Sequence, residues 1–207
     1  DLEDSVPLHQ KALAREAIKV HWSELQTKAV SVVIRINSPL TDEGVDDLSA
    51  LRSLSDLVGV MVPKCESAES LAKVTKVLPH AQLLPIIEST AGFLELKEIS
   101  LASQVARLVV GHIDFLADTG MVCSEDQQEL DTLRFQVAMC SRFANLSPAI
   151  DGVTVSVDDE KLIRADTERS IRFGFSGKLC IHPKQVDVVH NTFKPSASQI
   201  DWAKRVL

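Results

Sequence analysis

The chain has 207 residues, 45% of them hydrophobic and 25% charged, which is enough material for one sizeable hydrophobic core. Its net charge of −7 argues against nucleic-acid binding, because that requires clustered Lys and Arg side chains. No apolar stretch approaches the ~18 residues of a membrane span, no signal peptide is visible, and the four cysteines form no C-x-x-C pair, so we expect a cytoplasmic protein with reduced thiols.

Short apolar runs that end in a charged or polar residue recur along the chain. Such runs, built from aliphatic and β-branched residues without polar alternation, are typical of strands buried on both faces of a parallel sheet. The expected strands lie at residues 1–4, 31–37, 58–64, 83–88, 108–114, 149–151 and 178–182. The first of these shows only the end of a strand.

Amphipathic segments lie between these runs. In the first segment, Ala14, Ile18, Trp22 and Leu25 follow the spacing of a helix that packs on a sheet. Further helices are expected at residues 46–54, 67–78, 91–100, 130–144, 158–173 and 196–206. The alternation of strand and helix, without linkers or repeats, predicts one α/β domain that spans residues 1–207.

The ends of the expected strands indicate an active site. A charged residue at the carboxyl end of a buried strand is costly to bury unless it meets a partner, a metal or a ligand. The same placement on most strands is typical of the (β/α)8 TIM barrel. The expected strands are one too few to close such a barrel, so we expect a TIM barrel whose first strand and helix are missing from the chain. A naturally open or shortened barrel is the alternative.

Seven segments in fixed order cover nearly the whole chain. They read DLEDSV (residues 1–6), RINSP (35–39), VPKCES (62–67), PIIESTAG (85–92), DFLADTG (114–120), AIDG (149–152) and GFSGKLCIHP (174–183). Together they resemble the citrate lyase β-subunit family of the metal-dependent aldolase/citrate lyase superfamily, which includes citryl-, malyl- and citramalyl-CoA lyases. The chain departs from that family in two respects beside its missing first strand. It lacks the C-terminal extension that in relatives reaches over a neighbouring subunit's active site, and His112 replaces a residue that is often small or acidic.

The resemblance implies a Mg²⁺ site and a substrate-binding arginine. Glu88 and Asp114 match the family's Mg²⁺ ligands, and their hard carboxylate oxygens suit that ion. The alternative for both is an ordinary role as acids at helix amino termini. Arg35 matches the residue that binds the substrate carboxylate and thioester oxygen, a task that suits a planar fork of donors. A structural ion pair with Glu3 or Asp4 is the alternative for Arg35.

Glu3 and Asp4 are further candidate catalytic residues, because both face the same mouth as Arg35 if the barrel is correct. One of them would orient Arg35 or bind metal-bound water, and the other would cap the helix that begins near Pro7. The sequence does not separate the two roles.

Three more residues are candidate substrate contacts. Lys11 is expected to meet a CoA phosphate, although most charges on helix surfaces are simply solvated. Asp151 ends a strand, where a place in the pocket and a buried structural role are both open. His182 belongs to the family's last-strand signature, and we expect it to shape the pocket and contact CoA rather than act as a base.

The resemblance implies Mg²⁺-dependent cleavage of a C–C bond in a 3-hydroxy-3-carboxyacyl-CoA, namely citramalyl-, malyl- or citryl-CoA, to acetyl-CoA and a 2-oxo acid. Arg35 would stabilise the enolate oxygen. The base is expected on the extension of an adjacent subunit in a homo-oligomer, a trimer by family analogy. The alternatives are a thioesterase on the same metal site, a non-catalytic CoA-binding subunit, and a class I aldolase that forms a Schiff base on Lys64.

Overall fold

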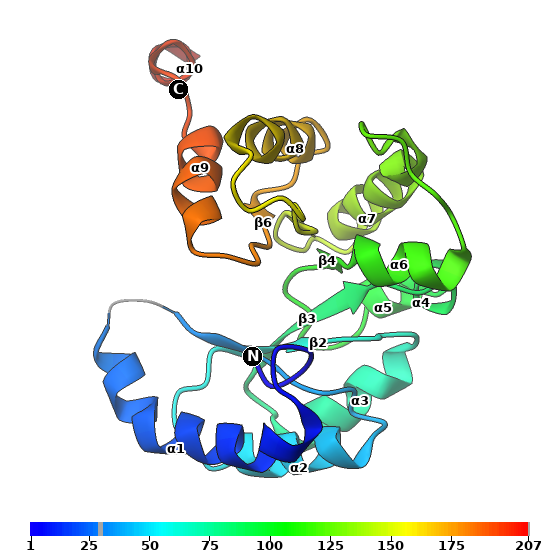
Figure 1. Cartoon of the computed structure of the whole chain (residues 1–207), viewed down its shortest axis with the longest axis vertical. Helices are drawn as coiled ribbons and strands as arrows, with labels where there is room; N and C mark the ends of the chain where they lie inside the picture. Colours follow the sequence, from blue (N-terminus) through cyan, green and yellow to red (C-terminus); the bar gives the residue numbers. More distant parts are fainter. Residues whose placement is uncertain (29–30, 207) are drawn as a thin grey trace.

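The computed structural model describes residues 1–28 and 31–206, and within them six short strands form one parallel sheet (Figure 1). The strands are β1 (Val33–Arg35), β2 (Gly59–Val62), β3 (Gln82–Ile87), β4 (Val109–Val110), β5 (Ile150–Asp151) and β6 (Gly177–Lys178). Each strand pairs in parallel with the next one along the chain, so the spatial order is the chain order. The result is a curled sheet with the shape of a half-barrel.

Helices connect the strands and cover the outer face of the sheet. They are α1 (Lys11–Thr27), α2 (Asp42–Leu51), α3 (Ala68–Val77), α4 (Thr90–Leu94), α5 (Leu96–Ser100), α6 (His112–Thr119), α7 (Asp131–Phe143), α8 (Glu160–Arg172), α9 (Lys184–Phe193) and α10 (Ala197–Val206), with 3-10 turns η1 (Leu8–Gln10) and η2 (Gln128–Leu130). Figure 1 shows α1 to α3 along one half of the sheet, α7 to α9 along the other, and α10 projecting beyond α9. No helix among residues 1–28 and 31–206 is long and apolar enough to cross a membrane.

Side-chain caps fix where several helices begin. Thr41, Ser67, Ser89 and Asp159 each accept a hydrogen bond from the backbone N–H three residues further on. Such a cap satisfies one of the amide groups that a helix start leaves without a partner. The cap at Ser89 matters most for the site, because it ends the extended chain of β3 directly after Glu88.

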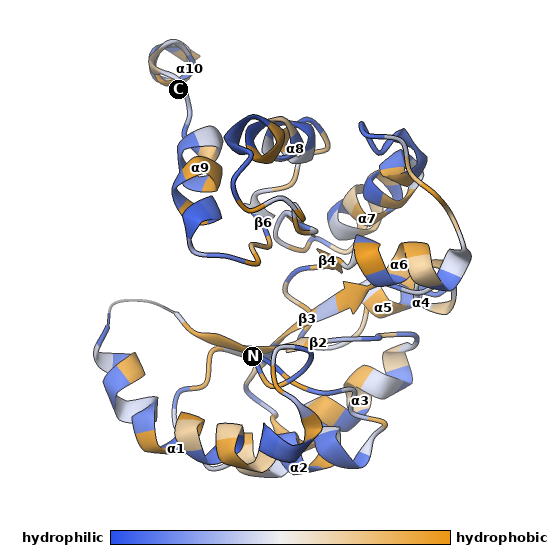
Figure 2. Cartoon of the chain, viewed as in Figure 1, coloured by the Kyte–Doolittle hydropathy of each residue, from blue (hydrophilic) through white to orange (hydrophobic). Residues whose placement is uncertain are grey.

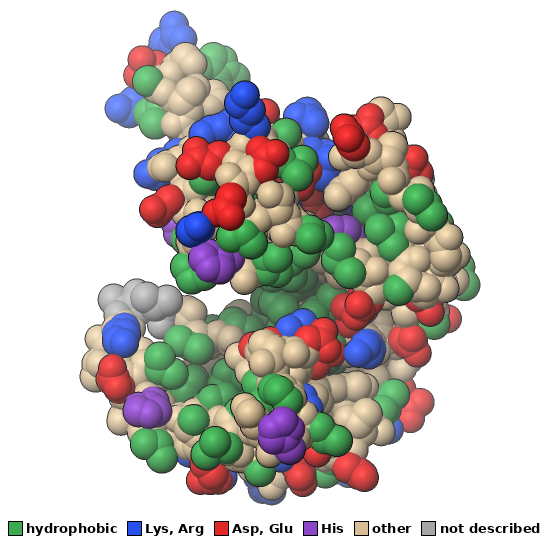
Figure 3. All heavy atoms as spheres, viewed as in Figure 1, with side chains coloured by type: hydrophobic (Ala, Val, Ile, Leu, Met, Phe, Trp, Pro, Cys, Tyr) green, Lys and Arg blue, Asp and Glu red, His purple; other side chains and the backbone are tan. Residues whose placement is uncertain are grey.

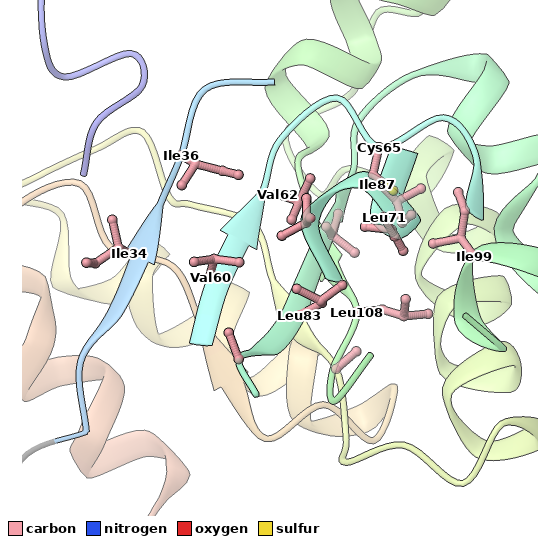
Figure 4. Packing of buried hydrophobic residues seen from close by; sticks show 14 of the residues in the cluster. Ile34, Ile36, Val60, Val62, Cys65, Leu71, Leu83, Ile87, Ile99 and Leu108 are labelled. Atoms are coloured by element: carbon pink, nitrogen blue, oxygen red, sulfur yellow. The ribbon is translucent and has the colours of Figure 1, made fainter. Parts of the chain in front are cut away.

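The two faces of the sheet carry separate apolar clusters, because successive side chains of a strand point to opposite sides. The outer face packs against the helices through Ile34, Val60, Val62, Leu83, Ile87, Leu108 and Val110. Figure 4 labels all of these side chains except Val110, and Figure 2 shows that the surrounding helices mix hydrophobic and hydrophilic residues. The inner face holds the smaller cluster of Leu84, Ile86 and Val109, with half-buried Val33, Met61, Ile150 and Leu179 around it. The same alternation directs Arg35, Glu88 and Gly111 to the inner face.

Several element predictions need correction. The strand expected at residues 108–114 ends at Val110, and α6 begins at His112, so Asp114 lies in a helix. The helix expected at 91–100 is divided into α4 and α5. Helix α9 was not predicted at all.

Residues 1–4 form no strand, so the expected count of seven strands is wrong by one among the described residues. The segment nevertheless lies beside β1, because the Leu2 amide donates a hydrogen bond of 2.8 Å to the Arg35 carbonyl oxygen. This contact places Glu3 and Asp4 at the carboxyl edge of the sheet. The six strands do not close a barrel.

Candidate active site

The carboxyl edge of the sheet surrounds a cavity of about 270 Å³ that is lined by four of the eight predicted site residues, namely Asp4, Arg35, Glu88 and Asp114. Arg35 ends β1, Glu88 follows β3, and Asp114 lies in the first turn of α6. These three side chains line the cavity together with Asp4, Ile86, Val110, Gly111, His112, Ile113, Gly152, Val153, Leu179 and Ile181. A hollow of about 570 Å³ between residues 51–57 and 76–81 contains none of the predicted site residues.

Glu88 is a buried carboxylate with 7% of its surface exposed. Its Oε1 accepts a hydrogen bond of 2.6 Å from the Lys64 backbone amide. Lys64 has a φ of 49°, which lies in the left-handed region that residues other than glycine rarely adopt. Backbone strain of this kind is common at functional sites. Burial raises the pKa of Glu88 to about 7, with the charges of Asp114 and Glu3 acting in the same direction and the Lys64 amide opposing them.

Gly111 makes room for the Glu88 side chain. A Cβ atom added at Gly111 would lie 2.5 Å from Glu88 Oε2 and 2.6 Å from Glu88 Cβ, closer than such atoms can approach. A larger residue at position 111 would therefore displace the carboxylate. This function of Gly111 was not predicted, and the one signal for it in the sequence is its place directly after the apolar run of β4.

Glu88 and Asp114 both line the cavity, and two carboxylates are a donor set that Mg²⁺ commonly uses. Asp114 is half-buried at the start of α6, where the helix dipole favours a negative charge. Among residues 1–28 and 31–206, no group of three or more His, Cys, Asp and Glu side chains is arranged to hold a metal. Mg²⁺ is commonly bound by one or two carboxylates, with water and substrate oxygens completing its octahedron. A nearby cation would also stabilise the ionised form of Glu88, whose pKa burial has raised.

Arg35 is held by carboxylates of the amino-terminal segment. Its Nε and Nη2 atoms donate to the two carboxylate oxygens of Asp1 at 2.8 and 2.6 Å. Its Nη1 atom lies 2.8 Å from Glu3 Oε2 and 3.8 Å from Asp4 Oδ2. The structural ion pair of Arg35 with Glu3 is thus present, as the alternative role of Arg35 predicted, and the guanidinium also lines the cavity. The pairing with Asp1 was not predicted.

Glu3 bridges Arg35 and Lys64. It is 6% exposed, and its Oε1 atom lies 3.3 Å from Lys64 Nζ. Burial raises the pKa of Glu3, although Arg35 and Lys64 oppose this change. Partial burial would lower the pKa of Lys64, but the carboxylates of Glu3, Asp4 and Glu88 raise it above its ordinary value. Lys64 is therefore an ammonium at neutral pH, which argues against its use as a Schiff-base nucleophile.

Lys11 lies in an unexpected place. Its ammonium is buried and donates to the carbonyl oxygens of Leu2 and Glu3 at 2.9 and 3.0 Å, and to Asn37 Oδ1 at 2.7 Å. These three acceptors use all its N–H groups, so the predicted contact with a CoA phosphate would require Lys11 to give them up. In this structure the hydrogen bonds of Lys11 hold the amino-terminal segment beside β1.

Asp151 and His182 lie outside the lining of the cavity. Asp151 is buried and accepts hydrogen bonds from Arg134 Nε at 3.3 Å and Ser170 Oγ at 2.5 Å. Burial tends to raise the pKa of Asp151, but Arg134, Lys178 and these hydrogen bonds hold it below its ordinary value. The structural alternative for Asp151 is therefore present. His182 is exposed, and its Nδ1 atom accepts a hydrogen bond of 3.2 Å from the Lys184 amide.

The chain is similar in sequence to known proteins over nearly its whole length. Residues 1–183 match the family model described as HpcH/HpaI aldolase/citrate lyase. The whole chain is 34% identical to a citrate lyase subunit beta-like protein of Deinococcus radiodurans and spans 75% of its length. It is 29% identical to a (3S)-malyl-CoA thioesterase of Cereibacter sphaeroides, with 99% of the chain and 71% of the relative aligned.

Solved structures show the same fold. Protein CitE of Mycobacterium tuberculosis, in complex with magnesium, acetoacetate and coenzyme A, superimposes with a TM-score of 0.83 at 28% identity, covering 100% of this chain and 75% of CitE. A complex of CitE with magnesium and pyruvate gives a TM-score of 0.81 at 27% identity, covering 95% of this chain and 80% of CitE.

Proposed function

Because the chain belongs to the HpcH/HpaI aldolase/citrate lyase family, we propose that it is a Mg²⁺-dependent carbon–carbon lyase of the citrate lyase β-like kind. The proposed substrate is a 3-hydroxy-3-carboxyacyl-CoA, namely citramalyl-, malyl- or citryl-CoA, and the products are acetyl-CoA and a 2-oxo acid. The observation that carries this proposal is the common cavity of Arg35, Glu88 and Asp114. The magnesium, coenzyme A and pyruvate bound by CitE support these ligand classes.

In this proposal Glu88 and Asp114 hold the Mg²⁺, which supplies Lewis-acid polarisation of the substrate's hydroxyl and carboxylate oxygens. The amino end of α6 adds an anion site beside them. The first intrahelical hydrogen bond runs from the Phe115 amide to the Gly111 carbonyl oxygen, so the amides of His112 and Ile113 precede it. Such amides, with the helix dipole behind them, suit the carboxylate of an oxo acid.

In this proposal Arg35 stabilises the negative charge that develops on the thioester oxygen. When the base removes the hydroxyl proton, the C–C bond breaks and its electron pair moves onto the acetyl carbon, so negative charge develops on the thioester oxygen. The Arg35 guanidinium lines the cavity and stabilises this oxygen in the proposal. Glu3 and Asp4 act in this proposal as positioning residues, because they hold Arg35 from the side of the amino-terminal segment.

A thioesterase on the same metal site is the second candidate. It is favoured by the similarity to the (3S)-malyl-CoA thioesterase of C. sphaeroides. The two activities differ in their first products, because a lyase releases acetyl-CoA and a thioesterase releases free CoA. A non-catalytic CoA-binding subunit would release neither.

Other parts of the proposal concern architecture and CoA contacts. We propose that the curled sheet belongs to a (β/α)8 barrel and that the protein assembles as a homo-oligomer, a trimer. The strand order supports the barrel, and family resemblance supports the trimer. The contacts of Lys11, Asp151 and His182 with substrate remain predictions, and exposed His182 is the one of the three whose side chain is free to meet CoA.

The deciding experiment is a product assay on citramalyl-, malyl- and citryl-CoA, with Mg²⁺ and then with EDTA. Acetyl-CoA and free CoA are separated chromatographically. Turnover should require Mg²⁺, and Glu88→Gln should abolish it. Glu98→Gln, the same change at an exposed site on α5, should leave it intact. Full turnover after exhaustive chelation would refute the metal assignment.

A further inference from the structure

The cavity has two chemically different sides. Arg35 and Asp4 lie at the β1 end of the sheet, and Glu88 and Asp114 follow β3 and β4. The opposite side consists of aliphatic side chains from the ends of β5 and β6, namely Val153, Leu179 and Ile181. In Figure 1 β6 lies in the half of the molecule that holds α7 to α9, opposite α1 and α2, and Figure 3 shows mainly hydrophobic side chains in the hollow between these halves.

Fixed positive charge is scarce in this cavity. Arg35 is the one Lys or Arg side chain that lines it among the described residues, whereas three carboxylates, Asp4, Glu88 and Asp114, do so. Arg35 is itself paired with Asp1 and Glu3. One bound Mg²⁺ would offset the Glu88 and Asp114 charges and leave no surplus cation for a second carboxylate on the ligand.

His112 closes the apolar side without offering a hydrogen bond. Its ring is 2% exposed and packs against Gly152, where an added Cβ atom would overlap Nδ1. Both ring nitrogens are buried, and neither has a hydrogen-bond partner within residues 1–28 and 31–206. A ligand in the cavity therefore meets the bulk of the imidazole and not its polar atoms.

Two cationic side chains near His112, Lys178 and Arg134, already have hydrogen-bond partners in the protein. Lys178 Nζ donates a hydrogen bond of 2.6 Å to the Gly152 carbonyl oxygen. Arg134 Nε lies 3.3 Å from both carboxylate oxygens of Asp151. Neither side chain lines the cavity, so neither is available to a ligand group without breaking these contacts.

We propose that this site selects a 2-oxo acid with a small apolar side group, a methyl group above all, and hence a citramalyl-type CoA ester over a citryl type. This inference rests on the proposed function and specifies its substrate. A second carboxylate, as in oxaloacetate, would lose its hydration against aliphatic side chains and meet no counter-charge. A hydrogen atom in the same place, as in glyoxylate, would leave the apolar wall unfilled.

The test measures equilibrium binding of pyruvate, glyoxylate and oxaloacetate to the Mg²⁺-loaded protein by calorimetry, so that no turnover is needed. Pyruvate should bind at least about tenfold more tightly than oxaloacetate, the lower range of discrimination by pocket contacts. Ile181→Lys, a change at a rim position that is 53% exposed, should narrow or reverse that ratio by placing a cation on the apolar side. Ile171→Lys is the matched control, because Ile171 is 40% exposed on α8 and does not line the cavity.

The outcomes distinguish a failure of the proposed selectivity from a failure of the proposed function. Oxaloacetate that binds as tightly as pyruvate, or an Ile181→Lys variant that keeps the wild-type ratio, overturns the selectivity alone. A selective loss of oxaloacetate binding in His112→Leu would also overturn it, because His112 would then be a hydrogen-bond donor to the second carboxylate. If none of the three acids binds, the proposed function falls together with the inference.

Discussion

Replacing Glu88 by glutamine should abolish Mg²⁺ binding and at the same time stabilise the metal-free protein at alkaline pH. Folding buries this carboxylate and raises its pKa from 4.5 to about 7. The folded protein therefore binds this proton more tightly than the unfolded chain does, and its free energy of unfolding falls as the pH rises through that interval. Glutamine has nearly the same shape and carries no charge, and its amide oxygen can still accept the hydrogen bond from the Lys64 amide.

The size of the effect follows from the same pKa change. The interval between 4.5 and about 7 corresponds to at most ~3 kcal/mol of unfolding free energy. Glu88→Gln should thus be more stable than the wild type by up to ~3 kcal/mol above about pH 8, and nearly equal to it below about pH 4. For a chain of 207 residues the alkaline difference is an increase in Tm of up to ~6–12 °C.

The assay is thermal unfolding in EDTA across this pH range, followed by the same melts with Mg²⁺ added. Mg²⁺ should raise the Tm of the wild type and leave Glu88→Gln unchanged, because a ligand stabilises only the form that binds it. Glu98→Gln, at an exposed position, controls for the loss of one negative charge and should shift neither series. A Glu88→Gln protein that is less stable than the wild type at alkaline pH, or a difference that does not change with pH, would refute the argument.

Three other substitutions test the site. Asp114→Asn should weaken Mg²⁺ binding at least about tenfold in calorimetric titration with little change in Tm, and unchanged affinity would remove Asp114 from the ligand set. Arg35→Lys should lower kcat roughly 100-fold, the effect of losing one oxyanion donor, whereas a change confined to KM would make Arg35 a binding residue only. Gly111→Ala should destabilise the fold by ~1–3 kcal/mol and impair Mg²⁺ binding, since its Cβ would lie 2.5 Å from Glu88 Oε2; wild-type melts and titrations would contradict this.

Local patterns in the sequence were sufficient for much of the sheet and for the choice of two candidate metal ligands. Uninterrupted apolar runs predicted β1, β2 and β3 because both faces of these strands are covered. Glu88 and Asp114 were predicted as metal ligands from their places in or after such runs, together with the family resemblance, and the structure places both on the lining of one cavity. The pattern failed where an apolar run crossed from strand to helix: residues 108–114 read as one strand, but α6 begins at His112.

Only the tertiary structure decided how the side chains meet. Arg35 pairs with Asp1, Lys11 binds Asn37, and Glu88 accepts a hydrogen bond from Lys64, all between residues more than twenty positions apart. Such contacts depend on the curl and register of the sheet, which bring separate strand ends to one rim, and no local pattern encodes them. The space at Gly111 is of the same kind, because the need for glycine there comes from Glu88 on the neighbouring strand.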